Sequence, residues 1–304
     1  GGGNISLRGK SYAMGVQTLW GASGVGFYFF SAATGTINSG IGTITIDGYS
    51  QTNTSSYAAG FYCMHNLTIT SANTTANAIR LIGKATGTSG EAWGIETESI
   101  FSVLATGIGG GISLSSSQQN SGNNYDIVFR GETNLLAVSG PINIITGQLG
   151  GITNGYLFLA APLYLGSKAG AVVTNSSSNI NIQVDRFNYN NYALPKLATS
   201  GSVTIQPNAT SFGMDIYTSY FSFNENGKTM TNFIYGKSGN AGNLYINSAL
   251  TVAGPISVYG NYVQINDNIT ITSSATGDIF IKSLYANNPS VYIGAATINK
   301  SAGT

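Results

Sequence analysis

The chain has 304 residues, of which 42% are hydrophobic and only 8% are charged, and its formal net charge is +1. The hydrophobic content excludes a disordered chain, and the lack of a basic stripe excludes the electrostatic footprint of a nucleic-acid or anionic-lipid partner. No apolar run approaches the ~20 residues of a membrane-spanning helix, so we expect no membrane span in this segment.

Polarity comes instead from Asn, Ser, Thr and Gly, which make an almost uncharged surface that is unusual for a cytosolic protein. Cys63 is the single cysteine, so no intrachain disulfide can form. Stability therefore has to come from another source, such as a long and regular ladder of hydrogen bonds.

Short runs of alternating apolar and polar residues occur along the whole chain, each bounded by turn residues such as Gly, Asn, Asp or Ser. This period of 2 predicts β-strands, and segments with a helical period are almost absent. In chain order the runs are ISL at 5–7, TITI at 43–46, LTI at 67–69, AIRLI at 78–82, ISL at 112–114, DIVF at 126–129, INII at 142–145, YLFLA at 156–160, INIQV at 180–184, SVTI at 202–205, LYI at 244–246, ISV at 256–258, VQI at 263–265, ITI at 269–271, DIFI at 278–281 and VYI at 291–293.

The length of these runs, three to five residues, discriminates between all-β architectures. Sandwiches and antiparallel barrels use strands of ~5–6 residues joined by hairpin turns, and Asn-Gly or Asp-Gly hairpin signals are sparse here. Very short strands separated by corners fit a coil in which each turn hydrogen-bonds to the next at ~4.8 Å along the axis. We therefore predict an all-β parallel β-helix, or β-solenoid. At ~20–25 residues a coil, the chain would make roughly a dozen coils.

Longer repeats also favour a solenoid that grew by duplication. LLAVSGPINI at 135–144 matches ALTVAGPISV at 249–258, and the opening GGGNISL resembles GIGGGISL at 108–114. We expect one continuous β-helix over residues 1–304.

Two stretches, 185–196 and 212–232, lack the alternating pattern and are expected to be irregular excursions from the coil. The first residues lack the basic start and apolar core of a signal peptide, and the last residues end abruptly. We therefore expect the segment to be a fragment of a longer repetitive chain.

The C-terminal third resembles a known family. LATSGSVTIQPNATSFG (197–213), FIYGKSGNAGNLYINSALTVAGPISVYGNYVQINDNITITS (233–273) and GDIFIKS (277–283) resemble the repetitive stalks of giant bacterial surface adhesins, the filamentous-haemagglutinin-like β-strand-repeat proteins. The likeness is strongest over about 195–304. The GKSGNAGNLYI segment is similar to segments of the giant adhesins of gliding bacteria, which the type IX route exports.

This resemblance implies a right-handed parallel β-helix that is secreted to the surface of a Gram-negative bacterium. It implies cell adhesion as the function, with surface glycans or other cell surfaces as partners. It also implies that secretion and outer-membrane anchoring machinery handles the parent chain. The family brings no catalytic residues, cofactor or metal, so we expect no enzyme activity.

The chain has 18 tyrosines, many of them in or beside the short runs. Alternate positions in LYI, VYI and ISVY place several of them on the outer face, where a phenol ring offers stacking and hydrogen bonding at low entropic cost. We predict glycan or surface contacts at Tyr189, Tyr192, Tyr245, Tyr259 and Tyr292. Stacking along the wall for stability alone is the alternative.

A β-helical polysaccharide-degrading enzyme or phage tailspike is the alternative function. Such enzymes use clustered carboxylates with a basic residue nearby, so this function requires Asp126, Asp185 or Asp215 to converge in a groove. Asp185 and Arg186 are the most suggestive pair in the sequence. An ice-binding solenoid is a third possibility, but its Thr rows would have to be more regular than the TIT and TIN triplets found here.

Two further pairs attract a functional interpretation. Cys63 and His65 would face the same way on a strand and could form a nucleophile pair or part of a metal site. A buried thiol beside a wall histidine is the alternative. Glu96 and Glu98 are expected to share one exposed face as solvated charges.

Overall fold

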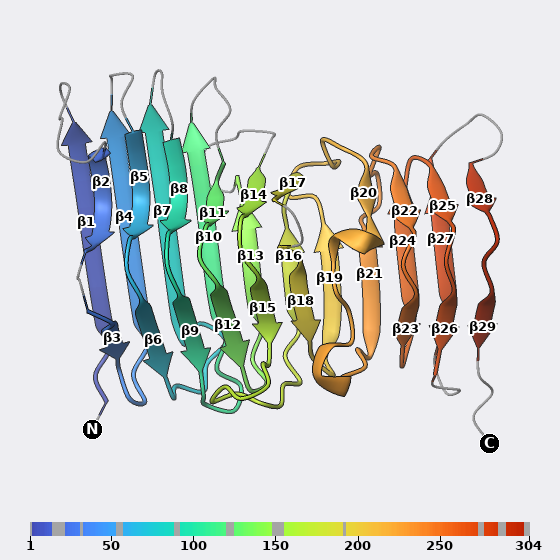
Figure 1. Cartoon of the computed structure of the whole chain (residues 1–304), viewed down its shortest axis with the longest axis horizontal. Coiled ribbons are helices and arrows are strands. Elements are labelled where there is room, and N and C mark those ends of the chain that lie inside the picture. Colours follow the sequence, from blue (N-terminus) through green and yellow to red (C-terminus); the bar gives the residue numbers. More distant parts are fainter. Residues whose placement is uncertain are drawn as a thin grey trace.

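Parallel strands stacked coil on coil make up the fold (Figure 1). The computed structural model describes residues 2–13, 22–30, 33–52, 57–87, 92–119, 125–147, 155–190, 193–272, 277–284 and 290–300. Within these residues every strand pair is parallel. The prediction of an all-β parallel β-solenoid is confirmed. No helix in the described part of the chain is long and apolar enough to cross a membrane.

The longest sheet, sheet A, takes one strand from each coil and runs the length of the molecule (Figure 1). Its strands are β1 (Ile5–Ala13), β4 (Ile44–Thr52), β7 (Ile79–Gly87), β10 (Ile112–Gln119), β13 (Ile142–Thr146), β16 (Ile180–Gln183), β19 (Ser202–Gln206), β21 (Asn232–Gly236), β24 (Ile256–Gly260) and β27 (Ile279–Ser283).

Two further sheets complete the first coils. Sheet B consists of β2 (Ala22–Phe29), β5 (Tyr57–Cys63), β8 (Ala92–Thr97), β11 (Ile127–Phe129), β14 (Tyr156–Leu159) and β17 (Arg186–Tyr189). Sheet C consists of β3 (Gly35–Asn38), β6 (Leu67–Ser71), β9 (Phe101–Ala105), β12 (Thr133–Ala137), β15 (Leu163–Gly166) and β18 (Pro195–Ala198).

Sheets D and E provide the other two walls in the C-terminal coils. Sheet D consists of β20 (Ile216–Tyr217), β22 (Leu244–Ile246), β25 (Val263–Ile265) and β28 (Val291–Ile293). Sheet E consists of β23 (Leu250–Val252), β26 (Ile269–Ile271) and β29 (Ile298–Lys300). Two short 3₁₀ turns, η1 (Thr218–Tyr220) and η2 (Glu225–Gly227), follow β20.

The core is a set of aliphatic columns that run along the axis. In sheet A the register pairs Ile44 with Ile79, Ile79 with Ile112, and Ile112 with Ile142, and all four side chains are fully buried. Burying one such side chain contributes about 1.5–3 kcal/mol. Each strand of sheet A adds one buried residue to the column. The alternating sequence pattern therefore produces a continuous core.

The coils are longer than predicted. Ile5 pairs with Ile44, so the first coil uses 39 residues, whereas Ile256 pairs with Ile279 only 23 residues later. The described residues therefore place ten strands in sheet A, and the prediction of a dozen coils is wrong. Only some of the later coils have the predicted length of ~20–25 residues.

A row of glycines explains why strands in the first coils are also longer than predicted. β1, β4 and β7 continue through Gly9, Gly48 and Gly83, which are register partners. A Cβ at Gly48 would lie 2.0 Å from the carbonyl oxygen of Gly60 in sheet B. The two sheets therefore touch backbone to backbone, and we call this level the neck. Glycines that suggested strand ends in the sequence lie inside strands, because only glycine fits there.

Beyond the neck, sheets A and B continue as a thin double layer. Figure 1 shows the long arrows of β1, β4, β7 and β10 reaching past the rest of sheet A. Ala58, Ala85 and Ala92 fill the space between the layers as a small cluster separate from the main core. Because the neck holds the sheets close together, only small side chains fit in this extension.

The sequence repeats occupy equivalent places in the coil. Residues 135–144 and 249–258 each contain wall-strand residues, from β12 and β23, followed by a Gly-Pro corner and the start of a strand of sheet A. The expected excursion at 185–196 instead contributes β17 and the start of β18, two regular wall strands. The stretch 212–232 holds the two-residue β20 and both 3₁₀ turns.

Candidate functional site

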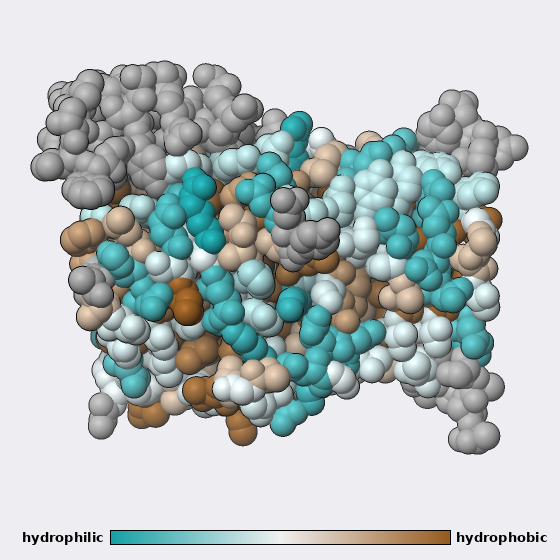
Figure 2. Space-filling model, viewed as in Figure 1, coloured by the Kyte–Doolittle hydropathy of each residue, from teal (hydrophilic) through white to brown (hydrophobic). Residues whose placement is uncertain are grey.

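Sheet D carries an outward row of polar and aromatic side chains, one from each of its strands. The register places Tyr217 beside Tyr245, Tyr245 beside Gln264, and Gln264 beside Tyr292. The alternate residues of β22, Leu244 and Ile246, are buried in the core. We call Tyr217, Tyr245, Gln264 and Tyr292 the sheet D row. In Figure 2, white and teal surface covers the region of β20, β22 and β25.

Two rings of this row stack on each other. The centroids of Tyr217 and Tyr245 are 4.4 Å apart and their planes differ by 12°. This separation is close to the ~4.7–4.9 Å between neighbouring strands, so the rings lie face to face along the solenoid axis. The stack occupies one face of each ring, and the rings of Tyr220 and Tyr262 pack beside Tyr217 (5.1 Å) and Tyr245 (6.1 Å). The row is therefore suited to hydrogen bonding more than to stacking on a ligand ring.

Polar neighbours hold the hydroxyl groups in place. Asp215 accepts hydrogen bonds from the Tyr245 hydroxyl (3.3 Å) and from Asn243 Nδ2 (3.0 Å). The Tyr262 hydroxyl donates to Gln264 Oε1 at 3.4 Å. Burial, followed by the charge of Asp215, raises the pKa of Tyr245 to about 12, so this hydroxyl stays protonated at neutral pH.

The structure brings two of the predicted contact tyrosines into one row and separates the others. Tyr245 and Tyr292 belong to the sheet D row, where Tyr292 is 45% exposed. Tyr259 lies on sheet A, with its ring tilted against Phe280 at 5.6 Å. Tyr189 is partly buried and packs against the core, and Tyr192 lies outside the described residues. Gln264 was missed because no single run shows which residues of successive coils become neighbours.

Sheet B also carries stacked aromatic rings on its outer face. Tyr28 and Tyr62 are neighbours in the register, with centroids 5.2 Å apart and planes within 8°. Further along the sheet, Tyr125 packs against Tyr156 (5.4 Å) and Phe158 (4.8 Å). Aromatic stacking along the wall is thus a structural device that recurs in both halves of the molecule.

The aspartates considered for catalysis are hydrogen-bond acceptors in the framework. Asp126 is buried, and its carboxylate accepts from the backbone N–H groups of Gln118 (3.0 Å) and Tyr156 (2.8 Å). Burial raises the pKa of Asp126 to about 7, although these bonds oppose the shift. Asp185 is also buried, whereas Asp215 lies beside the sheet D row.

Asp185 and Arg186 do not form a pair. Asp185 accepts from the backbone N–H groups of Gly155 (2.8 Å) and Ala209 (2.7 Å). Arg186 Nη1 donates to the Tyr156 hydroxyl at 3.1 Å. Asp185 is a buried residue at the bend before β17, whereas Arg186 begins the strand and is partly exposed, so the two side chains have different partners.

Glu96 and Glu98 do share one face, but the expectation that both are solvated is wrong. Arg130 Nε lies 2.7 Å from Glu96 Oε1 and 3.2 Å from Glu98 Oε1. Glu96 is fully buried, and its other oxygen, Oε2, has no partner among the residues that the structure describes. Burial raises the pKa of Glu96 to about 8 despite the guanidinium beside it.

Cys63 and His65 do not face the same way, contrary to the prediction, because β5 ends at Cys63. The thiol is buried and donates to the backbone carbonyl of His65 (3.0 Å), and the His65 ring lies against Phe30. Burial raises the pKa of Cys63 to about 12, so the sulfur is a neutral thiol and a weak nucleophile. Nowhere in the described ranges do three His, Cys, Asp or Glu side chains gather as metal ligands.

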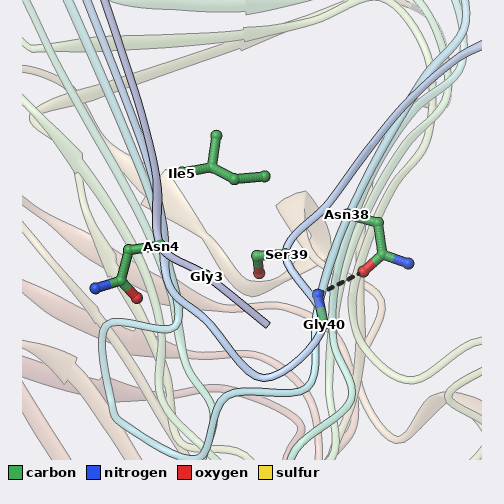
Figure 3. Close-up of a pocket in the computed structure, with 6 residues that line it drawn as sticks. All are labelled: Gly3, Asn4, Ile5, Asn38, Ser39 and Gly40. Carbon is green, nitrogen blue, oxygen red and sulfur yellow. Dashed lines mark hydrogen bonds between the residues drawn. The ribbon is translucent and has the colours of Figure 1, made fainter. Parts of the chain in front are cut away.

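A hollow of about 490 Å³ lies at the first coil, beside the start of β1 and the end of β3 (Figure 3). Its polar groups already have backbone partners. Asn38 Oδ1 accepts from Gly40 N at 2.8 Å, and Asn4 Oδ1 accepts from Thr43 N at 2.9 Å. β1 and β3 are the edge strands of sheets A and C, so the hollow is the open end of the stack.

Comparisons with protein-family models, curated proteins and solved structures find no match to this chain. The basis for a functional proposal is therefore the solenoid, its outer walls and the residues that they present.

Proposed function

We propose that this chain is a structural and adhesive stalk segment of a large cell-surface adhesin, which attaches to surfaces, cells or glycans. The sheet D row is the observation that carries this proposal. It aligns hydroxyl and amide groups along the axis of a rod at one group per coil. Weak contacts repeated in this way add up through avidity when the chain is long.

The low charge of the chain supports the same function. With 8% charged residues and a net charge of +1, the rod can approach surfaces of either sign without strong repulsion. The parallel ladder supplies stiffness without a disulfide. The placement of Asp126 and Asp185 as buried acceptors of backbone hydrogen bonds favours this role over polysaccharide cleavage.

The finer part of the proposal rests on the resemblance of residues 195–304 to giant repetitive adhesins. On that basis the chain is secreted to the bacterial surface as part of a longer protein. Its partners are then surface glycans or other cell surfaces, together with the export and outer-membrane anchoring machinery of the parent chain. Export by the type IX route and a role in gliding motility belong to the same proposal.

Single-molecule force spectroscopy tests the adhesive role. The chain is tethered to a cantilever and retracted from surfaces coated with neutral or anionic polysaccharide. The double variant Tyr217→Phe/Tyr245→Phe keeps the ring stack but removes two outward hydroxyl groups. We expect adhesion events to become several-fold rarer, since each hydrogen bond contributes about 0.5–1.5 kcal/mol.

Tyr235→Phe is the matched control. The Tyr235 ring is fully buried and its hydroxyl has no partner within the described ranges, so this change removes a phenol oxygen without altering the surface. Equal adhesion by the double variant and the control would overturn the role of the sheet D row. A wild-type chain that adheres no better than the bare cantilever would overturn the adhesive function itself.

A further inference from the structure

A groove of about 480 Å³ lies on the outer face of sheet C, beneath the loop at 168–173. This volume is within the range of small-ligand sites, about 300–1,000 Å³. The loop is closed by hydrogen bonds from Lys168 N to the Val173 carbonyl (3.0 Å) and from Ala171 N to the Lys168 carbonyl (3.2 Å). Every residue of β12 is buried, whereas β6 and β9 are half-exposed on this face. The loop therefore covers the outer side of β12.

The groove has an apolar floor and a polar wall. Leu104 and Leu136 are register neighbours on β9 and β12 and form the floor. Thr68, Ser102 and Asn134 are register neighbours on three successive coils and form the wall. In Figure 2, brown surface gathers over the region of β9 and β12. Each coil thus contributes one polar group, and two of the three add a leucine.

The polar wall presents unused hydrogen-bonding capacity. Asn134 Nδ2 donates to Ser102 Oγ and to Glu132 Oε1, each at 3.1 Å. Glu132 can only accept, so the amide nitrogen must face it and the amide oxygen must point away. Asn134 is 6% exposed, and its Oδ1 has no partner in the described part of the chain. Ser102 accepts from Asn134 and keeps its own proton free to donate, and Thr68 Oγ1 has no partner within the described residues.

Charge at the groove is already balanced. Lys168 Nζ lies 2.6 Å from Glu132 Oε1 and 4.3 Å from the centre of the Tyr164 ring. Burial alone would raise the pKa of Glu132, but the hydrogen bonds from Lys168 and Asn134 lower it, so this carboxylate is ionised at neutral pH. The ion pair balances the charge of the groove lining, and a further cation, Lys196, lies over the Tyr164 ring (5.1 Å) but does not line the groove.

We propose that this groove binds a neutral saccharide. An anionic sugar would gain no unpaired cation from the groove lining, since Lys168 is paired with Glu132. A purely apolar ligand would remove Ser102 and Thr68 from water without replacing their hydrogen bonds, which weakens binding. A neutral sugar ring places its C–H face on Leu104 and its hydroxyl edge along the polar wall. Its hydroxyl groups supply acceptors for Ser102 and Thr68.

Isothermal titration of the whole chain with tetrasaccharides tests this proposal. The neutral probes are tetramers of glucose, mannose and N-acetylglucosamine, and the charged probe is a tetramer of galacturonic acid. We expect at least one neutral tetramer to bind and the acidic tetramer to bind at least tenfold more weakly. Thr68→Val and Ser102→Ala should each weaken the neutral tetramer by about two- to tenfold, the equivalent of one hydrogen bond.

Thr36→Val is the matched control. Thr36 precedes Thr68 by one coil in the same outward column but does not line the groove. It should leave the affinity unchanged, whereas Leu104→Trp should abolish binding by filling the groove. Failure of every neutral tetramer to bind, or an equal loss in Thr36→Val and Thr68→Val, would overturn the proposal. The Tyr217→Phe/Tyr245→Phe variant keeps this groove intact, so the two proposals fail separately.

Discussion

Replacing Gly48 with alanine is expected to force sheets A and B apart at the neck. The new Cβ would lie 2.0 Å from the carbonyl oxygen of Gly60 and 2.7 Å from its carbonyl carbon, both of which are backbone atoms that cannot rotate away. Carbon atoms in ordinary contact are about 3.5–4.0 Å apart, so a strand has to move by about an ångström or more. Overpacking of this kind costs about 1–3 kcal/mol, which outweighs the ~0.4–1 kcal/mol that alanine gains by restricting the unfolded chain.

Denaturant titration of the whole chain measures this effect, with Gly3→Ala as the matched control. Nothing lies within 4 Å of a Cβ built at Gly3. We expect Gly48→Ala to be less stable than Gly3→Ala by about 1–2 kcal/mol. Because stacked coils can open locally, amide hydrogen exchange in β4 and β5 should also become faster. If the two variants are equally stable and exchange alike, the sheets do not touch at the neck and the reasoning fails.

Three other changes probe buried groups. Burial raises the pKa of Glu96 from 4.5 to about 8, so the folded chain holds this proton more tightly and the free energy of unfolding falls as pH rises between those values. Glu96→Gln should make the free energy of unfolding less dependent on pH, and urea midpoints at about pH 5 and about pH 8.5 measure the difference. If the variant lost as much stability over this interval as the wild type, Glu96 would not be the group that titrates. Asp185→Asn should cost about 1–3 kcal/mol in thermal unfolding, because its amide would point a donor at the N–H of Gly155 or Ala209; no loss would refute this. Phe61→Ala should lose about 3–5 kcal/mol in a denaturant titration, because Phe61 is fully buried, and a loss below about 1 kcal/mol would count against the packing.

The alternating runs were sufficient to predict the class of fold but not its dimensions. Ile44 and Ile46 are both buried in the same core, as the TITI pattern indicates. Gly48, two residues later, suggests the end of a strand, although β4 continues to Thr52. Its true role depends on Gly60 in another sheet, and contact between two sheets leaves no periodic signal in either strand.

In the candidate site, too, the sequence predicts the orientation of a residue but not its neighbours. An outward position for Tyr245 follows from the LYI run alone, and the structure places it on the outer wall. Which residues become its neighbours depends on register, and register depends on coil length. In this chain stacked partners are separated by between 19 and 39 residues. Glu96 illustrates the electrostatic version of the problem, since its burial depends on Arg130, a residue 34 positions away.

Asparagine at the corners of the solenoid explains how successive coils are joined with so few charged residues. In four coils the Asn that immediately precedes a strand uses its side-chain Oδ1 to accept the backbone N–H of its register partner in the next coil. These bonds are Thr43 N to Asn4 (2.9 Å), Ile100 N to Asn66 (3.1 Å), Ser202 N to Asn179 (3.0 Å) and Thr297 N to Asn268 (2.8 Å). Aspartate could accept the same bond, but it would add a negative charge at each corner, and like charges repel along a column. A neutral amide joins one coil to the next without that repulsion, so coils can be added to the rod while its net charge stays near zero.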